Sequence, residues 1–226
     1  MIDKKEYLVK NLKEINKILN DKELQEYLNV VFQEGISQHK KRKKLDGGYE
    51  IETYPAAEGF SRVQEIGNVI CNKKELWPSG FSADTILGQK IPLIKIKNII
   101  CTIKSTKNID ELWKKPSDYT KKYSRLNSEL TPQLNLITDE LEDSFIDDTL
   151  ISTAKYYGIL AYKLGADNKL EYMRFIFLSE TANSIVHEVE VPVILQEKKI
   201  EPENKSMKEN IELAKGESLK SIIKLR

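Results

Sequence analysis

The sequence predicts a single α+β domain with a mainly antiparallel sheet, and three observations indicate this class. The C-terminal half holds three consecutive runs of β-branched and aromatic residues, separated by Gly, Asp, Asn and Ser: 156–162, 170–178 and 185–191. Two isoleucine-rich runs, 91–96 and 99–103, flank Lys97-Asn98, which suits a two-residue hairpin turn. Apolar residues at spacings of three and four before residue 35 indicate helices.

The N-terminal region reads as a pair of helices over residues 1–46. Asn20-Asp21 divides two apolar stripes and provides a good N-cap for the second helix. A short strand is expected at 49–54, stopped by Pro55. A helix should follow over 56–76; Gly67 on its face would allow another element to approach closely.

The middle of the chain begins with a loop-like stretch from Trp77 to Gly88. After the hairpin, residues 108–130 are predicted to be helical with a break near Pro116. The acidic segment 140–154 should form a further helix, and we expect the helices to cover one face of the sheet. The domain is predicted to span 1–197, with 47–197 as its sheet-and-helix core and 198–226 as a polar tail, weakly helical or disordered.

Composition narrows the class of protein. The chain has 226 residues, of which 40% are hydrophobic and 31% charged, as in soluble globular proteins. No apolar run approaches the roughly 20 residues that a bilayer span needs, and the first residues lack a secretory pattern. Cys71 and Cys101 form no disulfide framework, so we expect a cytoplasmic protein without membrane association.

Charge is unevenly distributed although the net charge is only +1. Residues 89–125 contain ten bases and three acids, and a second basic run follows His39. Basic side chains interleaved with aromatic ones suit contact with a nucleic acid. Core packing of Tyr119, solvated helix ends and protected sheet edges would explain the same pattern. The candidate nucleic-acid-binding residues are Lys40, Lys41, Arg42, Lys43, Lys44, Lys95, Lys97, Lys114, Lys115, Tyr119, Lys121, Lys122 and Arg125.

An alternative assignment is a metal-dependent nuclease of restriction or defence type. Its candidate catalytic residues are the acids and lysine around the end of the last strand, or an adjacent acidic pair, holding Mg²⁺ or Mn²⁺: Glu190, Glu197 and Lys199, or Asp147 and Asp148. Adjacent residues on a helix point about 100° apart, which argues against the acidic pair. His39 and His187 have no His or Cys at metal-ligand spacing, so no zinc site is expected.

The region from about 90 to 195 resembles a family of uncharacterised proteins from Firmicutes and their phages. The matching pieces are a strand hairpin, a basic helix and the start of a strand-rich ending: 91–96 with 99–103, 115–119 with 126–130, and 155–160. The resemblance implies an α+β domain and a phage-like setting, and it implies no catalytic chemistry. High Lys, Asn and Ile usage also fits an AT-rich bacterial or phage genome.

From these observations we expect a non-enzymatic binding protein of a bacterial mobile element, phage or host. It would act through contacts with nucleic acid or with another protein and need no cofactor. The alternatives that remain are the metal-dependent nuclease and an inhibitor of a bacterial defence system.

Overall fold

The computed structural model describes residues 4–45, 55–86, 91–109, 111–131, 153–165 and 167–194. Contacts group Met1–Ile194 into one unit and Leu195–Arg226 into a second, which lies outside the described residues together with the predicted polar tail. The helices are α1 (Lys4–Leu19), α2 (Lys22–Leu45), α3 (Pro55–Asn72), α4 (Glu111–Lys114) and α5 (Asp118–Ser124), with 3₁₀ helices η1 (Lys74–Leu76) and η2 (Arg125–Leu130). The strands are β1 (Phe81–Ile86), β2 (Ile91–Ile96), β3 (Ile99–Ser105), β4 (Tyr156–Leu164), β5 (Leu170–Leu178) and β6 (Ile185–Val191).

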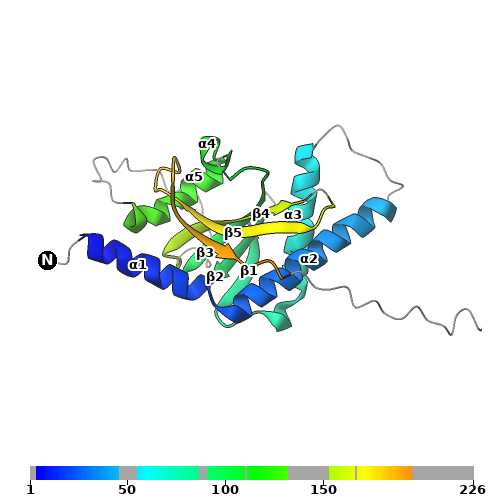
Figure 1. The fold of residues 1–226 in the computed structure, drawn as a ribbon, viewed down its shortest axis with the longest axis horizontal. Coiled ribbons are helices and arrows are strands. Elements are labelled where there is room, and N and C mark those ends of the chain that lie inside the picture. The colour runs from blue at the N-terminus through cyan, green and yellow to red at the C-terminus, as the bar shows by residue number, and fades with distance from the viewer. Residues whose placement is uncertain are drawn as a thin grey trace, which may run out of the picture. The chain divides into compact units, whose positions relative to one another are not determined.

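The six strands form one sheet in sequence order, β1 to β6 (Figure 1). Neighbouring strands are antiparallel except β3 and β4, which run parallel. A parallel pair needs a crossover connection, and the segment carrying α4, α5 and η2 provides it. The predicted α+β class, with its hairpin, its C-terminal meander and its N-terminal helical pair, is confirmed.

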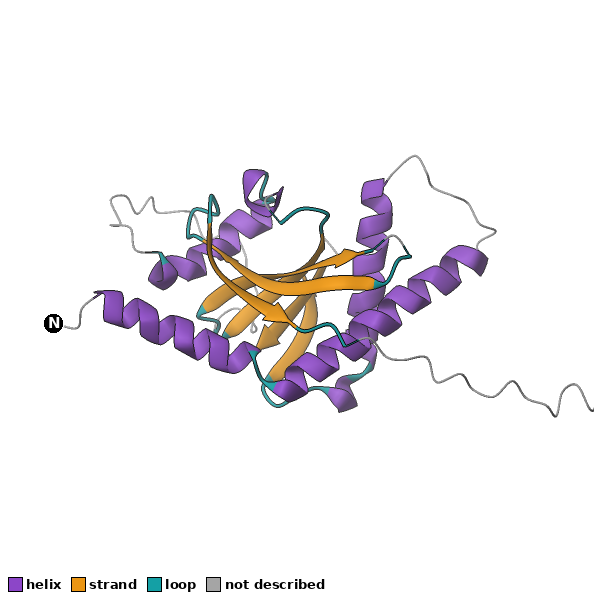
Figure 2. Cartoon of the chain, viewed as in Figure 1, coloured by secondary structure: helices purple, strands orange, loops and turns teal. Residues whose placement is uncertain are grey.

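Helices cover both faces of the sheet, so the expectation of a single covered face was wrong (Figures 1 and 2). Side chains alternate along a strand, which sends Ile99 and Cys101 of β3 to one face and Ile100 to the other. The first face packs against α1, α2, α3 and Leu130 of η2, and the second against α4, α5 and Leu126 of η2. The sheet therefore lies between two core layers, and η2 contributes a residue to each of them.

The N-terminal helices begin and pack for reasons visible in the sequence. Asp21 caps α2, because its Oδ1 accepts a hydrogen bond from the Leu24 N–H at 3.0 Å. Phe32 of α2 meets Tyr162 of β4 edge-to-face, with ring centroids 5.3 Å apart. At Gly35, α2 lies so close to α3 that an added Cβ would be 2.7 Å from the Cα of Ile66.

The structure differs from the sequence prediction at β1. Residues 81–86, predicted as loop, form β1, which pairs with β2 along its whole length. The strand predicted at 49–54 falls outside the described residues. So does most of the acidic helix predicted at 140–154; its last two residues, Thr153 and Ala154, are described and are not helical. The hairpin turn is confirmed: Ile96 pairs with Ile99, and Lys97 adopts a φ of 56°.

Candidate anion-binding surfaces

Several basic residues of the crossover segment between β3 and β4 are exposed to solvent. In α4, Leu112 is buried against the second face of the sheet, and in α5 Thr120 and Tyr123 are buried. This inward stripe turns the intervening side chains to solvent. We call the resulting set the α5 basic surface; its members are all exposed: Lys114, Lys115, Lys121, Lys122 and Arg125.

The α5 basic surface has an excess of positive charge. Glu111 and Asp118 are the exposed acids of residues 111–131, so five cations face two carboxylates. One of these acids is engaged locally, since Asp118 Oδ1 lies 3.6 Å from Lys121 Nζ within α5. An exposed pair of this kind contributes little energy and leaves the lysine able to reach another anion.

The aromatic residues beside these bases are turned toward the core. Tyr123 is only 5% exposed, and its ring centroid lies 5.4 Å from that of Tyr157. Tyr119 and Trp113 are half-buried and pack against the same core. The groups that this surface presents are therefore ammonium and guanidinium groups rather than open aromatic faces.

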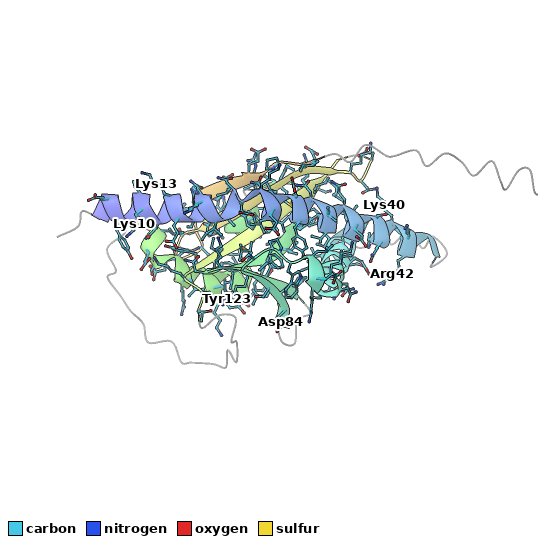
Figure 3. All side chains as sticks on the ribbon, turned by 90° about the horizontal axis from the view of Figure 1, so that it is seen from below. Lys10, Lys13, Lys40, Arg42, Asp84 and Tyr123 are labelled. Carbon is cyan, nitrogen blue, oxygen red and sulfur yellow. The ribbon has the colours of Figure 1, made fainter. Side chains whose placement is uncertain are left out.

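The Lys40–Lys44 run lies elsewhere, in the last turns of α2, which covers the first face of the sheet. Figure 3 shows Lys40 and Arg42 there, well separated from Tyr123 of α5. Arg42 is ion-paired with Glu65 of α3, and Lys43 lies 3.8 Å from Glu58.

The other members of the predicted set are dispersed. Lys40 Nζ donates to the Asp167 carbonyl at 3.3 Å, and Lys41 is exposed. Lys95 donates to Thr153 Oγ1, and exposed Lys97 occupies the β2–β3 turn. Of the predicted nucleic-acid-binding residues, those from Lys114 to Arg125 share the exposed side of the crossover segment, while the side chain of Lys44 falls outside the described part.

A small pocket between α2, α3 and the β4–β5 turn was missed by the sequence reasoning. Its volume is about 60 Å³, and its lining comes from α2, from α3 and from the end of β4 and the turn after it: Ile36, His39, Lys40, Lys43, Glu58, Arg62, Leu164 and Asn168. The α2 members recur at spacings of three and four, as do Glu58 and Arg62, so one helical face of each helix carries the signal. What the sequence lacks is any indication that these two faces meet.

The polar groups of this pocket are closely spaced without being tightly bonded. Glu58 Oε1 lies 3.9 Å from His39 Nε2, 3.8 Å from Lys43 Nζ and 3.8 Å from Arg62 Nη2. The His39 Nδ1 faces Ser61 Oγ at 3.5 Å. Burial of the ring and the nearby Arg62 guanidinium lower the pKa of His39 below its usual value, while Glu58 acts in the opposite direction.

Of the candidate catalytic residues of the nuclease alternative, the described part of the chain contains only Glu190. Glu190 is exposed on β6, with Arg174 Nη2 4.0 Å away. Glu197, Lys199, Asp147 and Asp148 lie outside the described ranges. Within those ranges, no group of three or more His, Cys, Asp or Glu side chains is arranged to hold a metal ion.

Comparison of the chain with protein families, with curated proteins and with solved structures finds no match. In the described part of the chain, no helix has both the length and the apolar character needed to span a bilayer.

Proposed function

We propose that this protein is a non-enzymatic nucleic-acid-binding protein that contacts the phosphate backbone through the α5 basic surface. The observation that carries the proposal is that five exposed cations follow one another along α4, the α4–α5 connection, α5 and the start of η2, while the apolar residues of the same segment are buried against the sheet. Each phosphate that a lysine or arginine neutralises releases counterions from the nucleic acid, and this release supplies sequence-independent affinity.

The orientation of the aromatic rings refines the expected mode of binding. Stacking of unpaired bases needs open ring faces, whereas Tyr123 packs against Tyr157 and Tyr119 is half-buried. Contacts would therefore be made mainly to phosphates, which position a nucleic acid without reading its sequence. We expect weak sequence preference and comparable affinity for duplex and single-stranded nucleic acids.

A cytoplasmic setting in a bacterium, phage or mobile element is part of the same proposal, supported by the free thiols of Cys71 and Cys101 and by composition.

The experiment compares two triple variants that remove the same charge from different places. The test variant replaces Lys115, Lys121 and Arg125 with Gln; the control replaces Lys13, Lys17 and Lys22, which are exposed on α1 and α2. The two sets are matched, since Lys121 pairs with Asp118 and Lys22 with Glu26 within their own helices. Binding of a labelled DNA duplex is followed by fluorescence anisotropy across a salt series.

The wild-type protein should lose affinity steeply as salt rises. If all three replaced cations contact phosphates, the slope of log K against log salt should become shallower by about 3 in the test variant. The control should retain the wild-type slope. Equal slopes in all three proteins, or no binding at low salt, would overturn the proposal.

A further inference from the structure

A second anion site is indicated by the pocket between α2 and α3. From its geometry we infer that this pocket binds a single phosphate group, as carried by inorganic phosphate or by a phosphate monoester such as a nucleoside 5′-monophosphate. The site is independent of the proposed nucleic-acid surface, because α2 and α3 cover the opposite face of the sheet from α5.

The charge of the pocket is suited to a dianion. Lys40, Lys43 and Arg62 bring three positive charges, and Glu58 brings one negative charge, which leaves two positive charges unmatched. A phosphate monoester carries about −1.5 to −2 at neutral pH, whereas a carboxylate ligand would leave one cation without a partner. Charge balance therefore favours phosphate over a carboxylate.

The donors of the pocket are incompletely used. The Arg62 side chain is only 15% exposed, yet its contacts are 3.8 Å from Nη2 to the Glu58 carboxylate and 3.5 Å from Nε to the Glu58 carbonyl. A good N–H···O bond is about 2.9–3.0 Å long, and a guanidinium offers five N–H donors in a fork that fits phosphate oxygens. Arg62 is thus positioned to accept a better partner than the one it has.

His39 supplies a second, independent indication. Its side chain is 11% exposed, and its Nε2 is buried with no hydrogen-bond partner although it lines the pocket. Buried polar atoms are normally bonded, so an unpaired ring nitrogen on a residue that lines the pocket is a donor or acceptor that a ligand could satisfy after a small rotation of the ring. A neutral imidazole with its proton on Nε2 would donate to a phosphate oxygen while Nδ1 faces Ser61 Oγ.

The size of the pocket limits what can enter it. One water molecule needs about 10–15 Å³ of cavity volume, so a pocket of about 60 Å³ holds about four or five oxygen-sized atoms. That matches one tetrahedral phosphate and excludes a nucleobase or sugar, which would remain outside. The apolar side chains of Ile36 and Leu164 also line the pocket.

Glu58 is expected to compete with the ligand. Its carboxylate lies within 3.9 Å of His39, Lys43 and Arg62, bonded closely to none of them, and its side chain is partly exposed. Because it repels a second anion, binding of phosphate would require Glu58 to turn toward solvent. Substitutions of cation and acid in the same pocket should therefore act in opposite directions.

The test measures binding of inorganic phosphate, AMP and adenosine by isothermal titration calorimetry at constant ionic strength in chloride. Phosphate and AMP should bind the wild-type protein, and adenosine should not. Glu58→Gln should strengthen phosphate binding, whereas Arg62→Gln and Lys43→Gln should weaken it by about tenfold each, the loss typical of a charge-assisted hydrogen bond. Lys41→Gln serves as the control, since it removes an exposed charge beside the pocket without lining it.

Comparing the affinities for inorganic phosphate and AMP distinguishes the free anion from a nucleotide as the ligand. Equal affinities for phosphate and AMP would identify the isolated anion as the ligand, and tighter binding of AMP would identify a nucleotide. Lys43 is half-exposed, so Lys43→Gln should fold, and Glu58→Gln should bind phosphate more tightly than the wild type. The test therefore does not depend on whether Arg62→Gln folds. Absence of binding, or binding unchanged by all three pocket substitutions, would overturn the inference whatever the outcome for nucleic acid.

Discussion

Asn127 and Tyr157 exchange two hydrogen bonds that join η2 to the sheet. Asn127 Nδ2 donates to the Tyr157 carbonyl at 2.8 Å, and its Oδ1 accepts from the Tyr157 N–H at 2.9 Å. The same Nδ2 also donates to the Leu178 carbonyl at 2.8 Å. The amide thus continues the hydrogen bonding of β4 and β5 beyond their last pair, Ile159 with Ile176, and it attaches η2 to the sheet.

Replacing Asn127 with Ala should destabilise the protein by about 3 kcal/mol, because buried main-chain groups of Tyr157 and Leu178 would lose their partner. Chemical denaturation measures the change in the free energy of unfolding. Asn20→Ala is the control: Asn20 is exposed at the end of α1, and its loss should cost no more than about 0.5 kcal/mol. Equal costs for the two variants would show that the buried amide does not stabilise the fold.

Gly59 and Gly67 of α3 should respond in opposite directions to the same substitution. A Cβ at Gly67 would lie 2.3 Å from Pro92 Cγ, so alanine there must push α3 away from β2, at a cost of about 1–3 kcal/mol. A Cβ at Gly59 would meet nothing within 4 Å, so alanine should stabilise the helix by about 0.5–1 kcal/mol. Thermal unfolding of both variants checks the signs; stabilisation by Gly67→Ala would contradict the close packing.

The sequence was most informative where local pattern and tertiary role agree. The strands β5 and β6 begin and end where the alternating runs predicted, and Asp21 caps α2 as expected. Gly67 also has the predicted role, since it admits Pro92 of β2. In each of these places a residue's own preference and its neighbours indicate the same structure.

The features that the sequence did not predict depend on contacts between segments distant in the chain. Three of the six residues of β1 are polar, namely Ser82, Asp84 and Thr85, so its strand character is weak locally and depends on pairing with β2. The parallel pairing of β3 with β4 has no local signal, because it depends on how the crossover returns. The same limit hid the α2–α3 pocket: His39 and Arg62 are brought together only when the two helices pack.

Arg42 is predicted to be a structural residue rather than a nucleic-acid contact. It pairs with Glu65, whose side chain is 4% exposed, so Arg42→Gln would leave a buried carboxylate without its cation. We expect a loss of about 1–3 kcal/mol in the free energy of unfolding, measured by denaturant titration. Lys41→Gln, one residue away and exposed, should change it by less than about 0.5 kcal/mol. Nucleic-acid affinity of the folded Arg42→Gln protein should stay close to wild type; a large loss there would place Arg42 in the binding surface.

The two histidines should make the protein less stable as pH falls below neutrality. Burial lowers the pKa of both: for His39, burial of the ring and then Arg62 are the causes, and for His187 burial outweighs the opposing effect of Glu188. Asn16 Oδ1 also lies 2.8 Å from His187 Nε2, in a contact that a neutral ring can make.

Because each histidine has a lower pKa in the folded protein than in the unfolded chain, the unfolded state takes up protons first as pH decreases. The stabilising contribution is therefore complete above about pH 6.5 and is lost as pH falls toward the folded-state pKa. Proton NMR of the imidazole rings should give both pKa values below about 6.5. Denaturation at about pH 7.5 and about pH 5.5, where most carboxylates remain ionised, should show a decrease in stability that is smaller in a variant with both histidines changed to Gln. A wild-type protein that gains stability over this interval relative to that variant would contradict the assignment.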